Sequence, residues 1–386
     1  MAKQRHAEIA GAGFGGLIAA IALAERGWSV RVHEKTPILR AEGFAISTQP
    51  NVIRILETVG ARDETVRGGL QIQLRETRNA QNQCTMSMRG GGHRISRQHM
   101  VTVLAARAMS LGVEIVANSP VRGADPGGEL ILETGERLVA DLVVGADGIN
   151  SVVRDSVDLL QSAKLHADGA MRFLVPRAGS EPTDTVVQPT TCEYWSGTRR
   201  VITSPCSETE LYVAMSCLAK DEEAKAVPLD ARSWSRSFPH LASLFSNIEA
   251  TADWSRIRWV QFQTIKLKRW SAGRVAILGD AAHAMPPNLA QGAGCAMMNA
   301  LALAVALDET PDVERALINW ERKERPLVEH TQFWSSLYSG FTVWPEFLRS
   351  LAFGALGRFA WLRRRYQRTA NHIPTGYRPA AQEIRS

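Results

Sequence analysis

The stretch AEIAGAGFGGLIAAIALAERGWSVRVHEK, residues 7–35, sets the fold expected for the chain. It opens with a short apolar run, passes through a glycine-rich turn into a continuous apolar segment, and closes with alternating residues that end at Glu34. These patterns predict a strand, a helix and a second strand. A strand-helix-strand unit of this kind belongs to a parallel sheet covered by helices.

The turn inside this unit has the glycine spacing of a phosphate-binding loop. Gly11, Gly13 and Gly16 form GxGxxG, with Gly15 inside the motif. Gly11 allows a tight turn, Gly13 lets a pyrophosphate approach the backbone, and Gly16 lets helix and strand pack closely beside the positive helix N-terminus. Glu34 is spaced to accept hydrogen bonds from a ribose diol. The full context predicts a dinucleotide site rather than a tight turn with a surface glutamate.

The rest of the chain predicts an α/β fold, α+β overall. A helix and strand over 96–117 lead into short strands that predict a β-meander, and a buried strand ends near residue 148. Alternating strands over 166–268 predict an antiparallel sheet inserted into the Rossmann-like frame. We therefore expect three parts. A discontinuous cofactor domain comprises residues 1–70, 96–165 and 269–330, and a substrate domain comprises residues 71–95 and 166–268. A C-terminal helical segment comprises residues 331–386.

The amino-acid composition argues against several classes of function. The 386 residues carry 45 Lys+Arg against 39 Asp+Glu, a net charge of +6 that is too weak and scattered for a typical nucleic-acid binder. Five cysteines without a CxxC favour neither a disulfide framework nor a zinc site, and we expect no metal. Neither a signal peptide nor an apolar run of membrane-spanning length is recognisable. We expect a cytoplasmic protein that binds small anionic ligands, without integral membrane association.

Two later turns, GADG at 145–148 and GDAAHAMPP at 279–287, each place an aspartate beyond a buried strand. Together with GxGxxG and an arginine that opens the helix from residue 97, they resemble the single-component flavoprotein aromatic hydroxylases. That resemblance implies non-covalent FAD. It also implies roles for Glu34, Lys35 and Arg40 near the adenosine ribose, Arg97 and Asp147 beside FAD, Asp280 on the ribitol, Pro286 and Pro287 in the flavin pocket wall, and the amides of Gly292, Ala293 and Gly294 facing the isoalloxazine.

The same resemblance implies the chemistry. NADH or NADPH, as a transient co-substrate, reduces FAD; O2 then forms a C4a-hydroperoxide that delivers one oxygen atom to an electron-rich ring. His283, although it follows Asp280, matches a position that is mostly structural in this family, so we expect a packed residue.

Within the family, phrases up to residue 330 are most similar to the pyridine-ring oxygenases. Matching positions assign Arg177, Arg200 and Tyr212 to the substrate, with Arg200, Tyr212 and Pro286 as catalytic residues. Ser47 stands in the pocket wall where those enzymes place an aromatic residue, so the substrate need not be the same compound. We expect hydroxylation, with or without ring opening, of an anionic hydroxylated N-heteroaromatic such as a hydroxypyridine carboxylate.

Other interpretations stay open. The enzyme could instead hydroxylate a benzenoid phenolic acid, or the chain could be a non-catalytic FAD-bound redox sensor. A flavin-dependent halogenase is disfavoured, because Trp254 to Trp259 lack the WxWxIP spacing and its proline. Residues 345–370 combine arginines with aromatic residues, as an interfacial amphipathic helix does; we expect this segment instead to cap the domain or build a dimer, and the protein to be a monomer or homodimer.

Overall fold

The computed structural model describes residues 4–39, 44–90, 92–178 and 188–379. A six-stranded sheet forms the cofactor side, and its strand order places β1 between β12 and β2. All neighbouring pairs are parallel except the antiparallel pair at one edge. From edge to edge the strands are β18 (Ser271–Ala272), β19 (Val275–Ile277), β12 (Leu142–Gly145), β1 (His6–Ala10), β2 (Ser29–His33) and β8 (Glu114–Val116).

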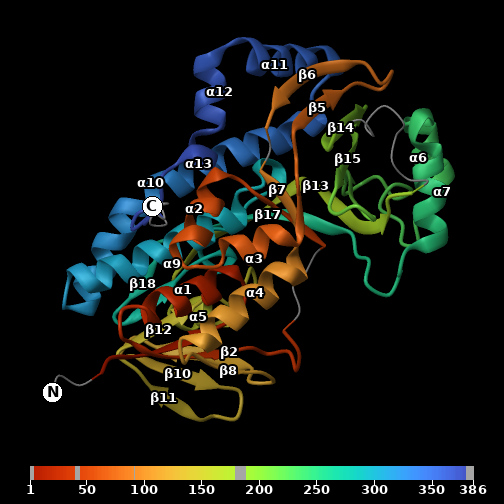
Figure 1. The fold of residues 1–386 in the computed structure, drawn as a ribbon. Helices are drawn as coiled ribbons and strands as arrows, with labels where there is room; N and C mark the ends of the chain where they lie inside the picture. Colours follow the sequence, from red (N-terminus) through yellow and green to blue (C-terminus); the bar gives the residue numbers. More distant parts are fainter. Residues whose placement is uncertain (1–3, 40–43, 91, 179–187, 380–386) are drawn as a thin grey trace, which may run out of the picture.

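Apolar residues with almost no exposure fill this layer, because the central strands are buried on both faces. Helix α1 (Phe14–Ala24) packs between α4 (Arg97–Ser110) and α9 (Gly292–Glu309) on one face. Figure 1 shows the β-meander beyond the other side of the sheet. Its strands are β9 (Val121–Asp125), β10 (Glu129–Leu132) and β11 (Arg137–Val139), and α5 (Val152–Ser156) packs on β9. The predicted parallel sheet and meander are both confirmed.

A seven-stranded sheet forms the second layer. It is antiparallel except where the early strand β5 runs parallel to β14. One face buries a separate core against α6 (Ala231–Ser237), η2 (Pro239–Leu241) and α7 (Ala242–Thr251). The order is β17 (Val260–Leu267), β13 (Leu160–Pro176), β16 (Glu210–Leu218), β15 (Arg199–Pro205), β14 (Thr190–Ser196), β5 (Leu74–Arg78) and β6 (Cys84–Arg89).

A small antiparallel sheet lies between the two large layers. It joins β3 (Ala45–Thr48), β7 (His93–Ser96) and β4 (Gly69–Gln71). Two helices follow its first strand: α2 (Pro50–Thr58), which packs on α9, and α3 (Arg62–Arg67). Successive side chains in its strands point to opposite faces of the sheet. Ile46 and Ile95 therefore enter the cofactor-side core, while their neighbours face the seven-stranded sheet.

The C-terminal part is helical, as expected, but no break occurs near residue 330. Helix α10 (Val313–Gly340) runs without interruption past that point, and Figure 1 shows it crossing from the cofactor side toward the seven-stranded sheet. The remaining helical elements are α8 (Asp280–His283), η3 (Pro287–Leu289), η4 (Phe341–Val343), α11 (Glu346–Arg358), α12 (Ala360–Tyr366) and α13 (Arg368–Asn371). Within the described ranges, none of the helices is both long and apolar enough to cross a bilayer.

Candidate active site

The glycine-rich turn between β1 and α1 leaves no room for side chains at two of its glycines. Gly11 has a φ of +99°, and a Cβ on it would overlap the carbonyl oxygen of Ala146. A Cβ on Gly16 would overlap the carbonyl oxygen of Gly11, whereas one on Gly15 would lie 2.6 Å from Leu278 Cδ1. Around Gly13, in contrast, nothing lies within 4 Å of the position of a Cβ. The turn is therefore closed toward the sheet and open at the position predicted to face a pyrophosphate.

Glu34 is fixed at the open side of this turn. Its Oε2 accepts a hydrogen bond from the Ala12 N–H at 3.1 Å, and its Oε1 accepts from the Thr36 N–H at 3.0 Å and from Thr36 Oγ1 at 2.9 Å. A carboxylate held beside the N-terminus of α1 fits the predicted role of ribose acceptor. Lys35 is exposed beside it, and Arg40 lies outside the described residues.

Asp147 sits directly against the glycine turn, because its Cα would be 3.1 Å from a Cβ on Gly11. Its Oδ2 accepts from the Val153 N–H at 3.1 Å, while Oδ1 is buried without a hydrogen-bond partner among the described residues. Burial raises the pKa of this carboxyl group. A buried oxygen without a donor is costly, so a ligand or water that donates to it would be favoured here. This arrangement fits a bound dinucleotide.

The segment from Gly279 to Gly294 brings the second predicted aspartate to the start of α9. Asp280 is exposed, and its Oδ1 would lie 3.9 Å from a Cβ on Gly292. The first helical amides, those of Gly292, Ala293 and Gly294, have no acceptor within the helix and give its N-terminus a positive potential. A ligand edge that carries negative charge would be stabilised at this end.

The two prolines are held from behind by α10. Ser335 Oγ donates to the carbonyl oxygen of Pro286, and Gln332 Nε2 donates to the carbonyl oxygen of Ala284 at 3.1 Å. Pro286 is buried and Pro287 is exposed at the start of η3. The turn is therefore a rigid wall between α9 and the seven-stranded sheet.

His283 lies in the core, as a packed residue would. It is 2% exposed, its Nε2 accepts from Asn299 Nδ2 at 2.9 Å, and its ring lies 5.6 Å from that of Trp270. Because burial disfavours the charged form, the pKa of His283 is lowered to about 4. The imidazole is neutral at pH 7 and contacts Asn299 of α9 and the Trp270 ring.

Two buried amides beneath the α9 N-terminus were not predicted from the sequence. Asn51 Nδ2 donates to Gln291 Oε1 at 2.8 Å, and a Cβ on Gly294 would lie 2.8 Å from that same oxygen. Asn51 Oδ1 and Gln291 Nε2 are buried without partners in the described part of the chain. Gly294 is thus required for packing α2 against α9 as well as for presenting its own amide. A buried Asn in an otherwise amphipathic helix such as residues 50–58 is the signal that could have identified it.

Two of the predicted substrate side chains, Arg200 and Tyr212, lie on the inner face of the seven-stranded sheet, which is the face opposite the core formed with α6 and α7. Tyr212 is 8% exposed and forms an apolar cluster with side chains of β3, β13 and β15. The members of this cluster, called the inner-face cluster below, are Cys206, Tyr212 and Ala214 with Phe44, Ala45, Leu174 and Ile202. Ser47, predicted in the pocket wall, is buried two residues beyond Ala45 on the same side of β3.

Arg94 is the main site residue that the sequence did not indicate. It lies opposite Ser47 in the β3–β7 pair, is 9% exposed, and has its guanidinium carbon 5.2 Å from the centre of the Tyr212 ring. Its Nε donates to Ser204 Oγ at 3.0 Å, and no carboxylate pairs with it among the described residues. Burial lowers the pKa of this guanidinium. A buried cation with terminal donors unused is poised for an oxygen of a ligand.

Arg200 is buried as well, but it is paired. Its guanidinium donates to Glu193 Oε1 and Ser216 Oγ at 3.3 Å each and to Asn288 Oδ1 at 2.8 Å. Glu193 also accepts from the Tyr338 hydroxyl at 2.8 Å. Arg200 therefore links the inner face to the turn after Pro287, and its contact with a substrate stays a prediction.

The three predicted substrate residues are spread along the sheet rather than gathered. Tyr212 pairs with Ser204, four residues from Arg200 on β15, so the two lie about 13 Å apart along the strands. Arg177 follows the end of β13 in the other direction, with its Nη1 3.9 Å from the exposed carboxylate of Glu208. Arg97 extends over the Phe14 ring at 4.8 Å, beside the glycine turn. Tyr212 and Ser47 are thus brought together, whereas Arg177 and Arg200 are not.

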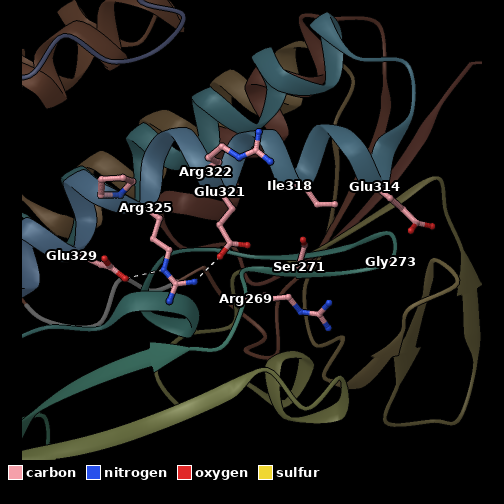
Figure 2. Close-up of a pocket in the computed structure, with 10 residues that line it drawn as sticks. Arg269, Ser271, Gly273, Glu314, Ile318, Glu321, Arg322, Arg325 and Glu329 are labelled. Carbon is pink, nitrogen blue, oxygen red and sulfur yellow. Dashed lines mark hydrogen bonds and ion pairs between the residues drawn. The ribbon is translucent and has the colours of Figure 1, made fainter.

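A surface pocket of about 540 Å³ lies elsewhere, between α10 and the edge strand β18. Figure 2 shows its charged lining, in which Arg325 pairs with Glu321 at 2.6 Å and with Glu329 at 2.9 Å. Arg325 also donates to the carbonyl oxygen of Leu267 at 2.8 Å. None of the predicted cofactor or substrate residues lines it, so these charges fasten the helix to the sheet edge.

Comparison with known proteins agrees with this geometry. The FAD binding domain family matches residues 5–327, which include every predicted cofactor residue. A Mycobacteroides abscessus protein named 2-heptyl-3-hydroxy-4(1H)-quinolone synthase is 36% identical over 360 residues, covering 92% of this chain and 95% of that protein. A Rhodococcus erythropolis protein provisionally given the same name is 39% identical, with coverage of 96% and 97%.

Among solved structures, the tetrameric form of 2-methyl-3-hydroxypyridine-5-carboxylic acid oxygenase superposes with a TM-score of 0.85 at 38% identity. The superposition covers 98% of this chain and 99% of the oxygenase chain. Other relatives are named as monooxygenases, and the glycine turn, Asp147 and the α9 N-terminus present the groups that a flavin dinucleotide requires. The chain therefore belongs to the FAD-binding family of aromatic-ring monooxygenases, and FAD is its cofactor.

Proposed function

We propose that this protein hydroxylates C3 of a 4(1H)-quinolone ring that carries an alkyl chain at C2. NADH or NADPH supplies two electrons, one atom of O2 enters the ring in place of the C3 hydrogen, and the other leaves as water. Bound FAD supplies the redox chemistry. The two relatives named for making a 3-hydroxylated 2-heptylquinolone support this substrate, because the similarity covers nearly their whole length.

The single observation that favours a quinolone substrate over a carboxylic acid is that the inner face has one buried arginine without a carboxylate partner in the described part of the chain. Arg94 is the buried guanidinium there without a carboxylate partner among the described residues, and it adjoins the inner-face cluster. Arg200 is already neutralised by Glu193. A single cation can pair with the ring oxygen of a quinolone, and the apolar side chains can pack against a bicyclic ring with an alkyl chain.

The residues of this chain would contribute to the reaction by positioning the substrate. We infer that the substrate binds between the small sheet and the seven-stranded sheet, with its ring oxygen toward Arg94 and the Tyr212 hydroxyl. Pro286 would limit how far the ring extends past the flavin, and the inner-face cluster would exclude water. A cation at the ring oxygen favours the electron-rich, deprotonated ring, which is the form that attacks an electrophilic oxygen.

A hydroxypyridine carboxylate is the second candidate, favoured by the 38% identity to the solved oxygenase and by the presence of Arg177 and Arg200. The test uses purified FAD-loaded protein with NADH or NADPH. It measures O2 consumption and product mass for 2-heptyl-4(1H)-quinolone, 2-methyl-3-hydroxypyridine-5-carboxylate and 4-hydroxybenzoate.

We expect a product 16 Da heavier from the quinolone, with NAD(P)H oxidation accelerated by it. Turnover of the pyridine acid alone would establish the second candidate, and turnover of 4-hydroxybenzoate alone would establish a benzenoid hydroxylase. Slow oxidation that no ring accelerates would be the behaviour of a redox sensor.

A further inference from the structure

The exposed aromatic side chains of this protein are gathered in one region. Across the described residues, every phenylalanine and tryptophan with large exposure lies between residues 333 and 361. Phe347 is 65% exposed, Leu351 67% and Trp361 61%. We define the C-terminal patch as Val343, Trp344, Phe347, Leu348, Leu351, Phe359 and Trp361. Figure 1 shows α11 and α12 at the top edge of the molecule, with α11 along β6.

The C-terminal patch is not a loosely packed part of the core, because α11 buries a different face against the rest of the protein. Phe353 and Leu356 pack with Trp195 and Tyr338, which is the capping role expected for this segment. Arg349 lies on the same buried side, donates to the Gly197 carbonyl oxygen at 2.8 Å, and is 2% exposed. The opposite face of α11 therefore carries exposed apolar side chains that none of the described residues covers.

Arginines accompany the patch on both helices. Arg358 follows Phe347 by 11 residues, which is about three helical turns, so both lie on one face of α11. Arg364 and Arg365 lie three and four residues after Trp361 and share its face of α12. None of Arg358, Arg363, Arg364, Arg365 and Arg368 forms an ion pair with a described carboxylate, and Arg363 donates only to the Gly357 carbonyl oxygen.

We propose that the C-terminal patch is a peripheral docking surface for an anionic lipid bilayer. Exposed Trp, Phe and Leu beside unpaired arginines match the chemistry of the interface between acyl chains and acidic headgroups. A second copy of this chain suits the surface less well. Between residues 343 and 371 the one acidic residue is Glu346, so a two-fold contact would bring unpaired arginines of both copies together.

The experiment uses the full-length FAD-loaded protein and vesicle sedimentation. Vesicles of phosphatidylcholine alone are compared with vesicles containing 30 mol% phosphatidylglycerol. The tested variants are F347S/L351S and R363Q/R364Q/R365Q. Matched controls remove exposed side chains of the same kinds elsewhere, L165S/V260S and K164Q/K220Q/K266Q. Flavin absorbance verifies that each variant is folded and loaded, and light scattering gives its oligomeric state.

We expect binding to the anionic vesicles only, with loss at high salt. Each basic residue near such a surface contributes roughly fivefold, so the triple arginine variant should bind about a hundredfold more weakly. F347S/L351S should also lose binding, while both controls keep it. The proposal is overturned if neither variant changes binding, if neutral vesicles bind equally well, or if F347S/L351S dissociates a dimer that binds no vesicles; the last result would assign the patch to a second copy.

Discussion

At the scale of single residues, the two buried arginines of the inner face differ in their electrostatic compensation. Arg200 has Glu193 as a counter-ion, whereas Arg94 has a serine hydroxyl and the Tyr212 ring. A buried cation without a counter-ion lowers the stability of the protein, and such groups persist where a ligand completes them. Arg94 is therefore the side chain on which substrate binding should depend most.

Replacement of Arg94 by glutamine should raise KM for the quinolone by roughly 10- to 100-fold, the size of a lost charged hydrogen bond, and leave bound FAD unchanged. Lysine should restore part of the loss. The thermal midpoint of R94Q should be equal to or above that of the unchanged protein, because the variant removes an unpaired buried charge. Steady-state kinetics and thermal unfolding check both. R122Q, an exposed arginine change, is the control, and an unchanged KM in R94Q would remove Arg94 from the substrate site.

His283 should make the fold sensitive to acid. Its pKa is about 4 in the folded chain against 6.5 for an unfolded histidine, so the folded state favours the neutral ring. This contribution is complete above pH 6.5 and is lost as pH falls toward 4, by up to about 3 kcal/mol. H283Q cannot protonate but can still accept from Asn299. Its thermal midpoint should therefore fall less between pH 6.5 and 4.5 than that of the unchanged chain; parallel curves would contradict the assignment.

Residues whose role depends on the local backbone could be identified from the sequence, whereas residues whose role depends on distant partners could not. Gly11, Gly16 and Glu34 belong to one turn, so their spacing predicted their geometry. Arg94 and Ser204 are 110 positions apart and meet only when two sheets face each other. No local pattern distinguishes such an arginine from a solvated one.

At the scale of elements, the cofactor turn depends on how closely α1 approaches β1. Gly16 is where the helix crosses the strand, since any Cβ there would overlap the Gly11 carbonyl oxygen. Backbone atoms cannot yield as a flexible side chain can. The close approach is thus a property of the strand-turn-helix unit rather than of one contact.

G16A should therefore separate α1 from β1 and lose FAD. We expect most of the purified variant to lack the flavin absorbance bands and to unfold at lower temperature. G354A is the matched control, because Gly354 is in a helix with nothing within 4 Å of a Cβ. There alanine should stabilise by up to about 1 kcal/mol. Full flavin content in G16A would show that the turn tolerates a wider spacing.

The elements themselves were largely predictable where one hydrophobic period ran through a segment. The strands near residues 7 and 142 and the helices near 14 and 292 are found as expected. The boundary predicted at residue 330 has no counterpart in the structure, because α10 continues through Pro326 to Gly340. Residues 71–95 are predicted to share a domain with residues 166–268, and β5 pairs with β14, more than 110 positions later, in the seven-stranded sheet.

At the scale of the whole molecule, the C-terminal helices tie the two large layers together. Arg349 and Phe353 hold α11 on Trp195 of the seven-stranded sheet. Farther along, the Tyr377 hydroxyl donates to Glu57 Oε2 at 2.9 Å, and Arg54 donates to the Asn371 carbonyl oxygen at 3.1 Å, both on α2 of the cofactor side. One segment therefore bridges the seven-stranded sheet and the helix beneath the α9 N-terminus.

Removal of residues 345–386 should uncover Trp195 and Phe341 and free α2. We expect a lower thermal midpoint and faster loss of FAD, measured by circular dichroism and flavin fluorescence. R349M tests the same bridge with one change, because it removes the hydrogen bond to Gly197 and the cation over Trp195. It should lower the midpoint in the same direction by less. An unchanged midpoint in both would mean that the layers hold together without this segment.

By itself, the sequence determined the parallel cofactor layer through the apolar runs of its strands, and the glycine turn with Glu34 and the two aspartate turns through short local motifs. The tertiary structure alone decided which arginine has a counter-ion, that His283 is neutral in the core, and which face of α11 is covered. Burial removes the charge of His283, whereas Arg94 meets Ser204, and α11 meets Trp195, only because segments more than a hundred residues apart come together. Hydrophobic periodicity in the sequence reports apolar faces, but it reports neither the burial nor the distant partners of a charged side chain.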